Sequence, residues 1–411
     1  MGWNEQELPL AKWLIDKTNT STYRQGKLKG SKYPEVDSEL LKNVGGRAEL
    51  VRQAKILENI PEIGGKEYLY FHWRDRLADI EYIKYRVDVI PRLCKLIGIT
   101  DARERQERAI KRVQQLKSFV SGNYLEAYCK VALEQLEKGN TKELSKIEDE
   151  DFMRCLEEMS QLEEPEWKRV FSARVFKTKH GITPSKVFEK FYQKKVIGVL
   201  RYSPRYEEGM SDEEILTAHG ILTYSQTLEW KGAVNYRLKN EKDEVIKSGI
   251  DAAGNYYGTV LNAQTLEHAV PISINGIEKI IVIENKANYE SMKYDPKVLY
   301  IFCHGFFSPK EVAFLRELMN IAPQGVQCYH WGDMDYGGIQ IFLYNEKNIF
   351  PELLPWKMDA DSYKEALEKG NGVALSDTKR KKLETVDAGK LEELKLCILE
   401  NGVEIEQEMQ L

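Results

Sequence analysis

The sequence lacks several features that assign a protein to a class at once. No apolar run approaches the roughly 20 residues that a helix needs to span a bilayer. The first ten residues contain neither the basic region nor the apolar core of a secretory signal, so none is expected. The six cysteines show no C-x-x-C spacing, which argues against zinc fingers and iron–sulfur clusters and favours reduced thiols. We therefore expect a cytoplasmic protein that does not enter a membrane.

Two common phosphate-binding motifs are absent as well. There is no G-x-x-x-x-G-K-[ST] loop, and no G-x-G-x-x-G follows a strand-like run. The sequence has an Asp-x-Asp pair, but it follows the third strand-like run of its region. A phosphatase that uses such a pair as nucleophile would place it after the first strand. These absences argue against nucleotide binding of the usual kinds and against that class of phosphatase.

An overall excess of basic residues is also missing, since the net charge is −5. The charge is nevertheless segregated. Residues 168–205 contain eleven lysines and arginines and one acid, Glu189, so this segment carries +10 and the rest of the chain −15. A helix over residues 186–201 would place its lysines on one stripe and Phe188, Tyr192 and Val199 on another face. Such a helix suits DNA phosphates, although an ordinary surface helix has the same pattern. The candidate DNA-binding residues are Lys177, Lys179, Lys186, Lys190, Lys194 and Arg201.

A chain of 411 residues favours two or three domains. Residues 1–145 have mostly helical periodicity and predict a helical N-terminal arm for dimerisation or docking. Residues 146–275 predict short helices and then alternating strands, which is the outline of a winged helix. Residues 276–411 alternate short apolar strands with helices, which predicts a parallel, doubly wound sheet. The predicted fold class is therefore a multidomain α+β protein.

Capping residues mark several of the predicted helix starts. Thr183 precedes a proline at the first helical position. Ser211 and Glu214 have the spacing of a capping box, and Ser308 has the same relation to Glu311. His219 is most simply interpreted as a residue at a helix C-terminus. These signals fix where the helices of the second and third parts of the chain begin.

Acidic residues follow two of the apolar strands in the last part of the chain. Glu284 closes "KIIVI", and Asp333 and Asp335 follow "VQCYHW". Ligands of parallel sheets bind beyond the carboxyl ends of the strands, and residues two apart in extended backbone point to the same side. Carboxylates in this arrangement suit Mg²⁺ or Mn²⁺ and metal-dependent phosphodiester chemistry. In the simpler alternative, Asp335 only caps the helix that starts near Gly337.

The order of these motifs resembles the Toprim domain of topoisomerases, primases and related nucleases. More closely, residues from about 165 to 411 resemble the C-terminal part of the JetD family, the nuclease subunits of bacterial Wadjet plasmid-defence systems. The segments that carry the resemblance are "IVIENKANYESM", "IFCHGFFSPKEVAFLREL", "CYHWGDMDYGGIQIFLY", "WKMDADSY" and "EIEQE". That family is similar to the A subunit of the archaeal type IIB topoisomerase and to the meiotic double-strand-break protein.

The resemblance implies a divalent-metal-dependent endonuclease that cuts closed circular plasmid DNA. Glu284 would be the acid/base residue and a metal ligand, and Asp333 and Asp335 would hold Mg²⁺ or Mn²⁺. The basic module would meet double-stranded DNA. An SMC-type motor ATPase with its kleisin and accessory subunits would be the partner. Cutting both strands needs two active sites, which predicts a homodimer.

The sequence departs from the topoisomerase-like relatives at their nucleophile, which is a tyrosine in the winged helix. No tyrosine occurs between Tyr128 and Tyr192, and Phe171 and Phe176 stand in the corresponding region. A phenyl ring has no oxygen to attack phosphorus, which favours hydrolysis by a metal-activated water. A topoisomerase-like transesterase and a non-catalytic DNA-binding clamp with a degenerate Toprim fold remain the alternatives.

Four further residues could join the site. His304 and His330 flank it, and a structural, hydrogen-bonded role is the simpler interpretation of both. Glu406 and Glu408 lie close to the end of the sequence and could reach the metal. The sequence leaves all four open.

Overall fold

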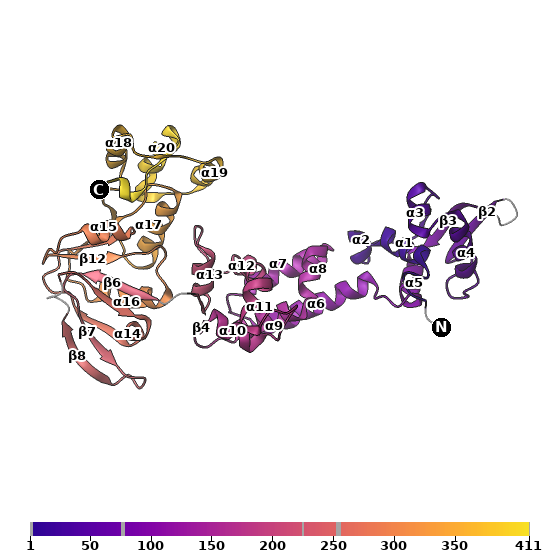
Figure 1. Cartoon of the computed structure of the whole chain (residues 1–411), viewed down its shortest axis with the longest axis horizontal. Coiled ribbons are helices and arrows are strands. Elements are labelled where there is room, and N and C mark those ends of the chain that lie inside the picture. The colour runs from indigo at the N-terminus through magenta and orange to yellow at the C-terminus, as the bar shows by residue number, and fades with distance from the viewer. Residues whose placement is uncertain (1–2, 75–78, 224–225, 252–255, 411) are drawn as a thin grey trace. The chain divides into compact units, whose positions relative to one another are not determined.

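The computed structural model describes residues 3–74, 79–223, 226–251 and 256–410. It divides into two compact units, Met1–Gln161 and Leu162–Leu411 (Figure 1). No helix among the described residues has both the length and the apolar character needed to cross a membrane. The six cysteines are free thiols, as predicted.

Unit 1 is mostly helical, as its periodicity predicts, and also contains a small antiparallel sheet in the order β1-β3-β2. Apolar residues from the helices up to the start of α6, and from β2 and β3, share one core, which includes Trp13, Leu50 and Phe71. The elements are α1 (Pro9–Thr18), α2 (Ser21–Arg24), β1 (Ser31–Lys32), α3 (Ser38–Val44), α4 (Arg47–Glu58), β2 (Leu69–Arg74), β3 (Asp79–Arg86), the 3₁₀ turn Val87–Val89, α5 (Ile90–Leu96), α6 (Ala102–Phe119), α7 (Glu126–Glu137), α8 (Thr141–Ile147) and α9 (Glu150–Ser160).

Unit 2 begins with short helices. Its first elements are β4 (Glu166–Trp167), α10 (Lys168–Val175), α11 (Pro184–Val187), the π-helical turn η3 (Phe188–Tyr192), α12 (Gln193–Leu200), α13 (Asp212–Ala218) and β5 (Ile221–Leu222). The helix expected over residues 186–201 therefore runs from Pro184 to Leu200 with a π-helical turn inside it. Thr183 stands at the N-cap but makes no side-chain cap hydrogen bond. The capping box of Ser211 and Glu214 is present at the start of α13.

The strands that follow are divided between two sheets. They are β6 (Thr227–Lys231), β7 (Asn235–Lys239), β8 (Val245–Asp251), β9 (Thr259–Asn262) and, after α14 (Ala263–His268), β10 (Ala269–Ser273). The antiparallel sheet β10-β7-β8 stands by itself, whereas β6 and β9 extend the sheet of the C-terminal part. The boundary expected between residues 275 and 276 thus does not separate two sheets.

The main sheet of unit 2 has the order β14-β13-β11-β12-β6-β9. The strands β11 (Lys279–Ile283), β12 (Val298–Phe302), β13 (Gln327–Trp331) and β14 (Leu354–Pro355) are parallel, as predicted, and β6 pairs antiparallel with β12. The helices are α15 (Lys286–Ser291), α16 (Pro309–Asn320) with its predicted capping box, and α17 (Tyr336–Asn348). Apolar side chains from β11 and β12, with Tyr289 of α15, fill the core on one face.

The remaining elements gather beside α17 (Figure 1). They are α18 (Ala360–Glu368), β15 (Val373–Ala374), α19 (Asp377–Thr385), the 3₁₀ turn Gly389–Leu391, α20 (Glu392–Asn401), β16 (Val403–Glu404) and the 3₁₀ turn Gln407–Gln410. Strands β15 and β16 pair antiparallel, which brings residues 403–404 back beside residues 373–374. The chain therefore folds back on itself shortly before its last described residues.

The strand order creates a place for a ligand. The chain passes from β11 to β12 on one side and returns to β13 on the other side of β11. In parallel sheets a crevice forms where the direction of connection reverses, beyond the carboxyl ends of the two strands involved. Here those strands are β11 and β13, which are followed by Glu284 and by the Asp-x-Asp pair.

Candidate active site

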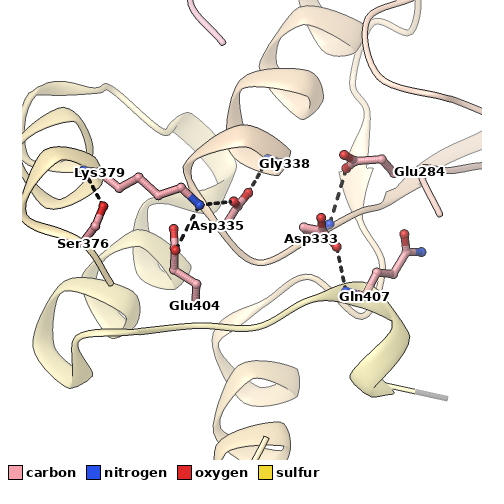
Figure 2. A network of polar contacts seen from close by, with 8 residues as sticks. All are labelled: Glu284, Asp333, Asp335, Gly338, Ser376, Lys379, Glu404 and Gln407. Carbon is pink, nitrogen blue, oxygen red and sulfur yellow. Dashed lines mark hydrogen bonds and ion pairs between the residues drawn. The ribbon is translucent and has the colours of Figure 1, made fainter. Parts of the chain in front are cut away.

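Glu284 lies at the end of β11, where its backbone N–H donates to the Trp331 carbonyl of β13 over 3.0 Å. Its Oε2 accepts a weak hydrogen bond from the backbone N–H of Asp333 over 3.4 Å (Figure 2). Burial raises the pKa of the Glu284 carboxyl to about 8, and the negative charges of Asp333 and Asp335 add to this shift. The carboxylates of Glu284, Asp333 and Asp335 are therefore close enough for their charges to interact.

The Asp-x-Asp run is extended and pairs with a segment from the C-terminal part of the chain. Met334 is buried and exchanges two backbone hydrogen bonds with Ile405, over 2.9 and 3.2 Å. Because neighbouring residues of extended backbone point to opposite sides, Asp333 and Asp335 both point away from the buried Met334 side chain. Asp333 Oδ1 accepts from the backbone N–H of Gln407 over 2.7 Å.

Asp335 uses its two oxygens differently. Its Oδ1 caps α17 by accepting from the Gly338 N–H over 2.8 Å, so the simpler alternative for this residue is confirmed as one of its roles. Its Oδ2 lies 2.9 Å from the ammonium of Lys379. A Cβ at Gly338 would lie 2.0 Å from the Asp333 carbonyl oxygen, so the close approach of the first turn of α17 to Asp333 requires glycine there.

Lys379 and Glu404 belong to this cluster and were missed by the sequence analysis. Lys379 Nζ lies between Asp335 and Glu404, 3.0 Å from Glu404 Oε2 (Figure 2). Burial lowers the pKa of Lys379, but the two carboxylates outweigh it and the net shift is upward. Burial raises the pKa of Glu404, although Lys379 opposes that shift. No local sequence pattern singles out Lys379 or Glu404, so their place in the site is visible only in the folded structure.

Gln407 connects the two acidic loops. Its side-chain Oε1 accepts from the Asn285 N–H over 2.8 Å, and its carbonyl accepts from the Asn288 side chain over 2.9 Å. Together with its own N–H to Asp333, these bonds fix the loop after β11 against the loop after β13. Gln407 is thus a positioning residue for the site.

The four residues left open by the sequence have different surroundings. His304 makes its expected structural hydrogen bond, with Nε2 3.1 Å from Glu311 Oε1. His330 is buried against Phe342, and neither of its ring nitrogens has a hydrogen-bond partner among the described residues, so its expected hydrogen bond is not seen. Glu406 is exposed, and the side chain of Glu408 lies outside the described residues.

The donors fit a hard divalent cation in their chemistry. They are carboxylate oxygens, the ligands that Mg²⁺ and Mn²⁺ prefer. The Glu404 carboxylate interacts with Lys379 and with the Tyr336 backbone N–H, and its buried Oε1 makes no well-formed hydrogen bond among the described residues. Within the described part of the chain, however, no three acidic, histidine or cysteine side chains are gathered as a ready ligand set. Figure 2 shows the ammonium of Lys379 in contact with both Asp335 and Glu404.

The candidate DNA-binding residues lie on the helical part of unit 2. Lys177, Lys186, Lys190 and Lys194 are exposed, whereas Phe188, Tyr192 and Val199 are buried, so the predicted division into a basic and an apolar face is confirmed. The ammonium of Lys179 contacts the hydroxyl of Tyr192 and lies over its ring. Arg201 lies 3.7 Å from Asp212. Two of the six residues are therefore engaged within the protein.

The fold and the site define an α/β protein in which acidic residues line the carboxyl edge of a parallel sheet. Residues 238–410 match the family described as "Wadjet protein JetD, C-terminal". The chain is also 28% identical over 386 residues to "Wadjet protein JetD" of Bacillus cereus (strain Q1), a match that covers 90% of this chain and 89% of that protein. Over most of its length the chain is therefore similar to a Wadjet JetD protein.

Proposed function

We propose that this protein is a divalent-metal-dependent DNA endonuclease that cuts closed circular DNA within a Wadjet-type antiplasmid defence complex. The observation that carries the proposal is the meeting of Glu284 and Asp333 at the crevice between β11 and β13, with Asp335 beside them. The similarity to Wadjet JetD proteins supports the defence role. In this proposal the main sheet of unit 2 is a Toprim domain, and its preceding helices are a winged-helix-like module.

The acidic residues divide into metal ligands and a proton acceptor in the proposed reaction. Asp333 and Asp335 would hold Mg²⁺ or Mn²⁺, with Asp335 giving up its contact with Lys379. The bound cation would polarise the phosphoryl oxygen and make an attacking water more acidic. Glu284 would accept the proton of that water, and its raised pKa suits a general base near neutral pH. Gln407 would hold the loop after β11 against the loop after β13.

The surroundings of the two phenylalanines support hydrolysis over transesterification. Phe171 is fully buried and Phe176 is 4% exposed, and neither ring carries a nucleophilic oxygen. Water would thus be the nucleophile, and the DNA would be left with free ends. A covalent protein–DNA adduct that survives denaturation would instead indicate the topoisomerase-like alternative.

The partners follow from the same proposal. Lys186, Lys190 and Lys194 would lie against the phosphates of double-stranded DNA, which gives affinity with little sequence preference. An SMC–kleisin motor complex would deliver the circular DNA, and unit 1 would serve in docking or dimerisation. A homodimer would supply the two sites needed to cut both strands. The protein would work in the cytoplasm.

A non-catalytic DNA-binding clamp is the second candidate, and one observation favours it. Asp335 already has a helix cap and an ion pair as partners. If these were its only roles, the acidic residues would stabilise the fold and the basic helix would carry the function. The proposed nuclease requires that Asp335 can exchange the Lys379 contact for a metal ion.

Cleavage of a closed circular plasmid by the purified protein, with Mn²⁺ and with the SMC partners added, tests the proposal. Glu284→Gln removes the proton acceptor with little change in shape and is expected to slow cleavage by about 10³-fold. Glu278→Gln is the matched control, because Glu278 precedes the opposite end of the same strand and is exposed. Binding without any cutting by the wild type would favour the clamp, and full activity of Glu284→Gln would refute the assigned role.

A further inference from the structure

The pairing of Met334 with Ile405 places acidic residues opposite one another. In an antiparallel pair, the residue after one member faces the residue before the other, so Asp335 lies across from Glu404 and Asp333 across from Glu406. Like charges at opposite positions destabilise a strand pair. The short ladder therefore concentrates negative charge on one face, and the Lys379 ammonium lies at one end of that face.

The two carboxylates beside Lys379 are held more firmly than the lysine is. Only 10% of the Glu404 side chain and 20% of the Asp335 side chain are exposed, compared with 42% of the Lys379 side chain. Glu404 belongs to β16, and Asp335 is fixed as the cap of α17. Lys379 reaches them on a flexible stem from the surface. The cation can therefore leave toward solvent while the oxygens stay in place.

Two observations indicate that this place is built for a cation and not for this lysine alone. The Glu404 carboxylate has Lys379 and the Tyr336 backbone N–H as donors, but its buried Oε1 makes no well-formed hydrogen bond among the described residues, so the pair is not fully satisfied. Lys379 also stands in the first turn of α19, where the helix dipole disfavours positive charge. Its position is thus explained by the two carboxylates and not by the helix.

We propose that Asp335 and Glu404 form a divalent-cation site that the ammonium of Lys379 fills in the resting protein. Lys379 and the metal ion then compete for the same oxygens, and metal binding displaces the lysine toward solvent. Glu404 becomes a metal ligand that was not among the predicted site residues. The inference rests on the proposed function, since it deepens the metal site assigned to Asp333 and Asp335.

Binding of Mn²⁺ in the absence of DNA, measured by titration calorimetry, tests the inference without relying on activity. Lys379→Met keeps the length of the side chain and removes its charge, so Mn²⁺ is expected to bind about tenfold tighter. Glu404→Gln is expected to bind about tenfold more weakly. Lys382→Met is the matched control, because Lys382 lies on the same helix and pairs with Glu208 over 2.7 Å. Its affinity should stay within about twofold of the wild type.

The outcomes separate this inference from the proposed function. Mn²⁺ binding that Asp333→Asn weakens, but that neither Lys379→Met nor Glu404→Gln changes, would overturn the competition and leave the proposed metal site intact. Failure of Mn²⁺ to bind the wild type and every variant would overturn both.

A second measurement uses the wild-type protein and does not depend on the folding of a variant. The lysines are dimethylated with ¹³C, which keeps their charge, and Mg²⁺ is added during NMR. The Lys379 signal is expected to move toward that of a solvated lysine, while the Lys382 signal stays. A Lys379 signal unchanged at saturating Mg²⁺ would contradict the displacement.

Discussion

The acidic edge of the main sheet and the basic helical stretch of residues 184–200 are built in opposite ways. The edge draws its charged groups from the loops after β11 and β13, from α19 and from β16, and it leaves them buried or half-buried. The helical stretch carries Lys186, Lys190 and Lys194 on consecutive turns and leaves them exposed. Charges that are gathered from distant segments and buried interact strongly, whereas exposed charges on one helix act nearly independently.

The largest difference between the two regions is expected from glycine substitutions. At Gly338 a Cβ would lie 2.0 Å from the backbone oxygen of Asp333, whereas at Gly198 of α12 no atom lies within 4 Å. Gly338→Ala should therefore destabilise the protein by roughly 3 kcal/mol or more. Gly198→Ala should stabilise it by about 0.5–1 kcal/mol. Scanning calorimetry measures both changes in stability. Equal changes for Gly338→Ala and Gly198→Ala would show that the two regions do not differ in how closely their backbones are packed.

The next effect concerns DNA affinity and tests whether the helical charges act independently. Replacing Lys186, Lys190 and Lys194 by Gln should weaken DNA binding roughly tenfold or more and lower the slope of log affinity against log salt by roughly 2 to 3. Affinity is measured by fluorescence anisotropy at several salt concentrations. The control replaces three exposed lysines of unit 1 (Lys27, Lys42 and Lys66), which changes the net charge equally. Equal losses in both triple variants would indicate a general charge effect.

A third effect is the pH dependence of stability at the acidic edge. The pKa of Glu284 is raised to about 8 in the folded protein, above its ordinary value of 4.5. Its contribution to stability is therefore fully present below about pH 4.5 and is lost as the pH rises through about 8. Without divalent cations, wild type should lose more stability than Glu284→Gln between pH 5 and pH 8.5.

Denaturant unfolding at these pH values measures the difference, with Glu278→Gln as the control. Adding Mg²⁺ should reduce the loss in the wild type, because a bound cation stabilises the ionised carboxylate. Equal losses of stability in wild type and Glu284→Gln over this pH range would show that the pKa of Glu284 is not raised in the folded protein.

Helices and strands could be predicted from the sequence where a local pattern of residues marks them. The apolar runs predicted the parallel strands β11, β12 and β13, and the capping boxes at Ser211 and Ser308 marked two helix starts. The strand order placed Glu284 beside Asp333 because both follow strands that meet at one edge. These features depend on a few consecutive residues or on general rules of sheet topology.

The remaining features could not be predicted because they depend on which distant segments pair. Alternation in β6 and β9 marks them as strands, but no local pattern indicates that they pair with β12 and with each other. Glu404 is not distinguished from Glu406 by type or context, and only the register of Ile405 against Met334 places Glu404 beside Asp335. Lys379 lies among several basic residues of α19, and its partners decide its role.

The antiparallel strand β6 has a practical consequence for anyone who divides this protein. The region that matches the family begins at residue 238, after β6 has ended at Lys231. A fragment cut at that point would leave the Val298–Phe302 strand with an open, apolar edge, because β6 supplies its hydrogen bonds on that side. Open edges of this kind recruit strands from other molecules. Such a fragment should form aggregates on expression, and starting it before Thr227 should restore a soluble product.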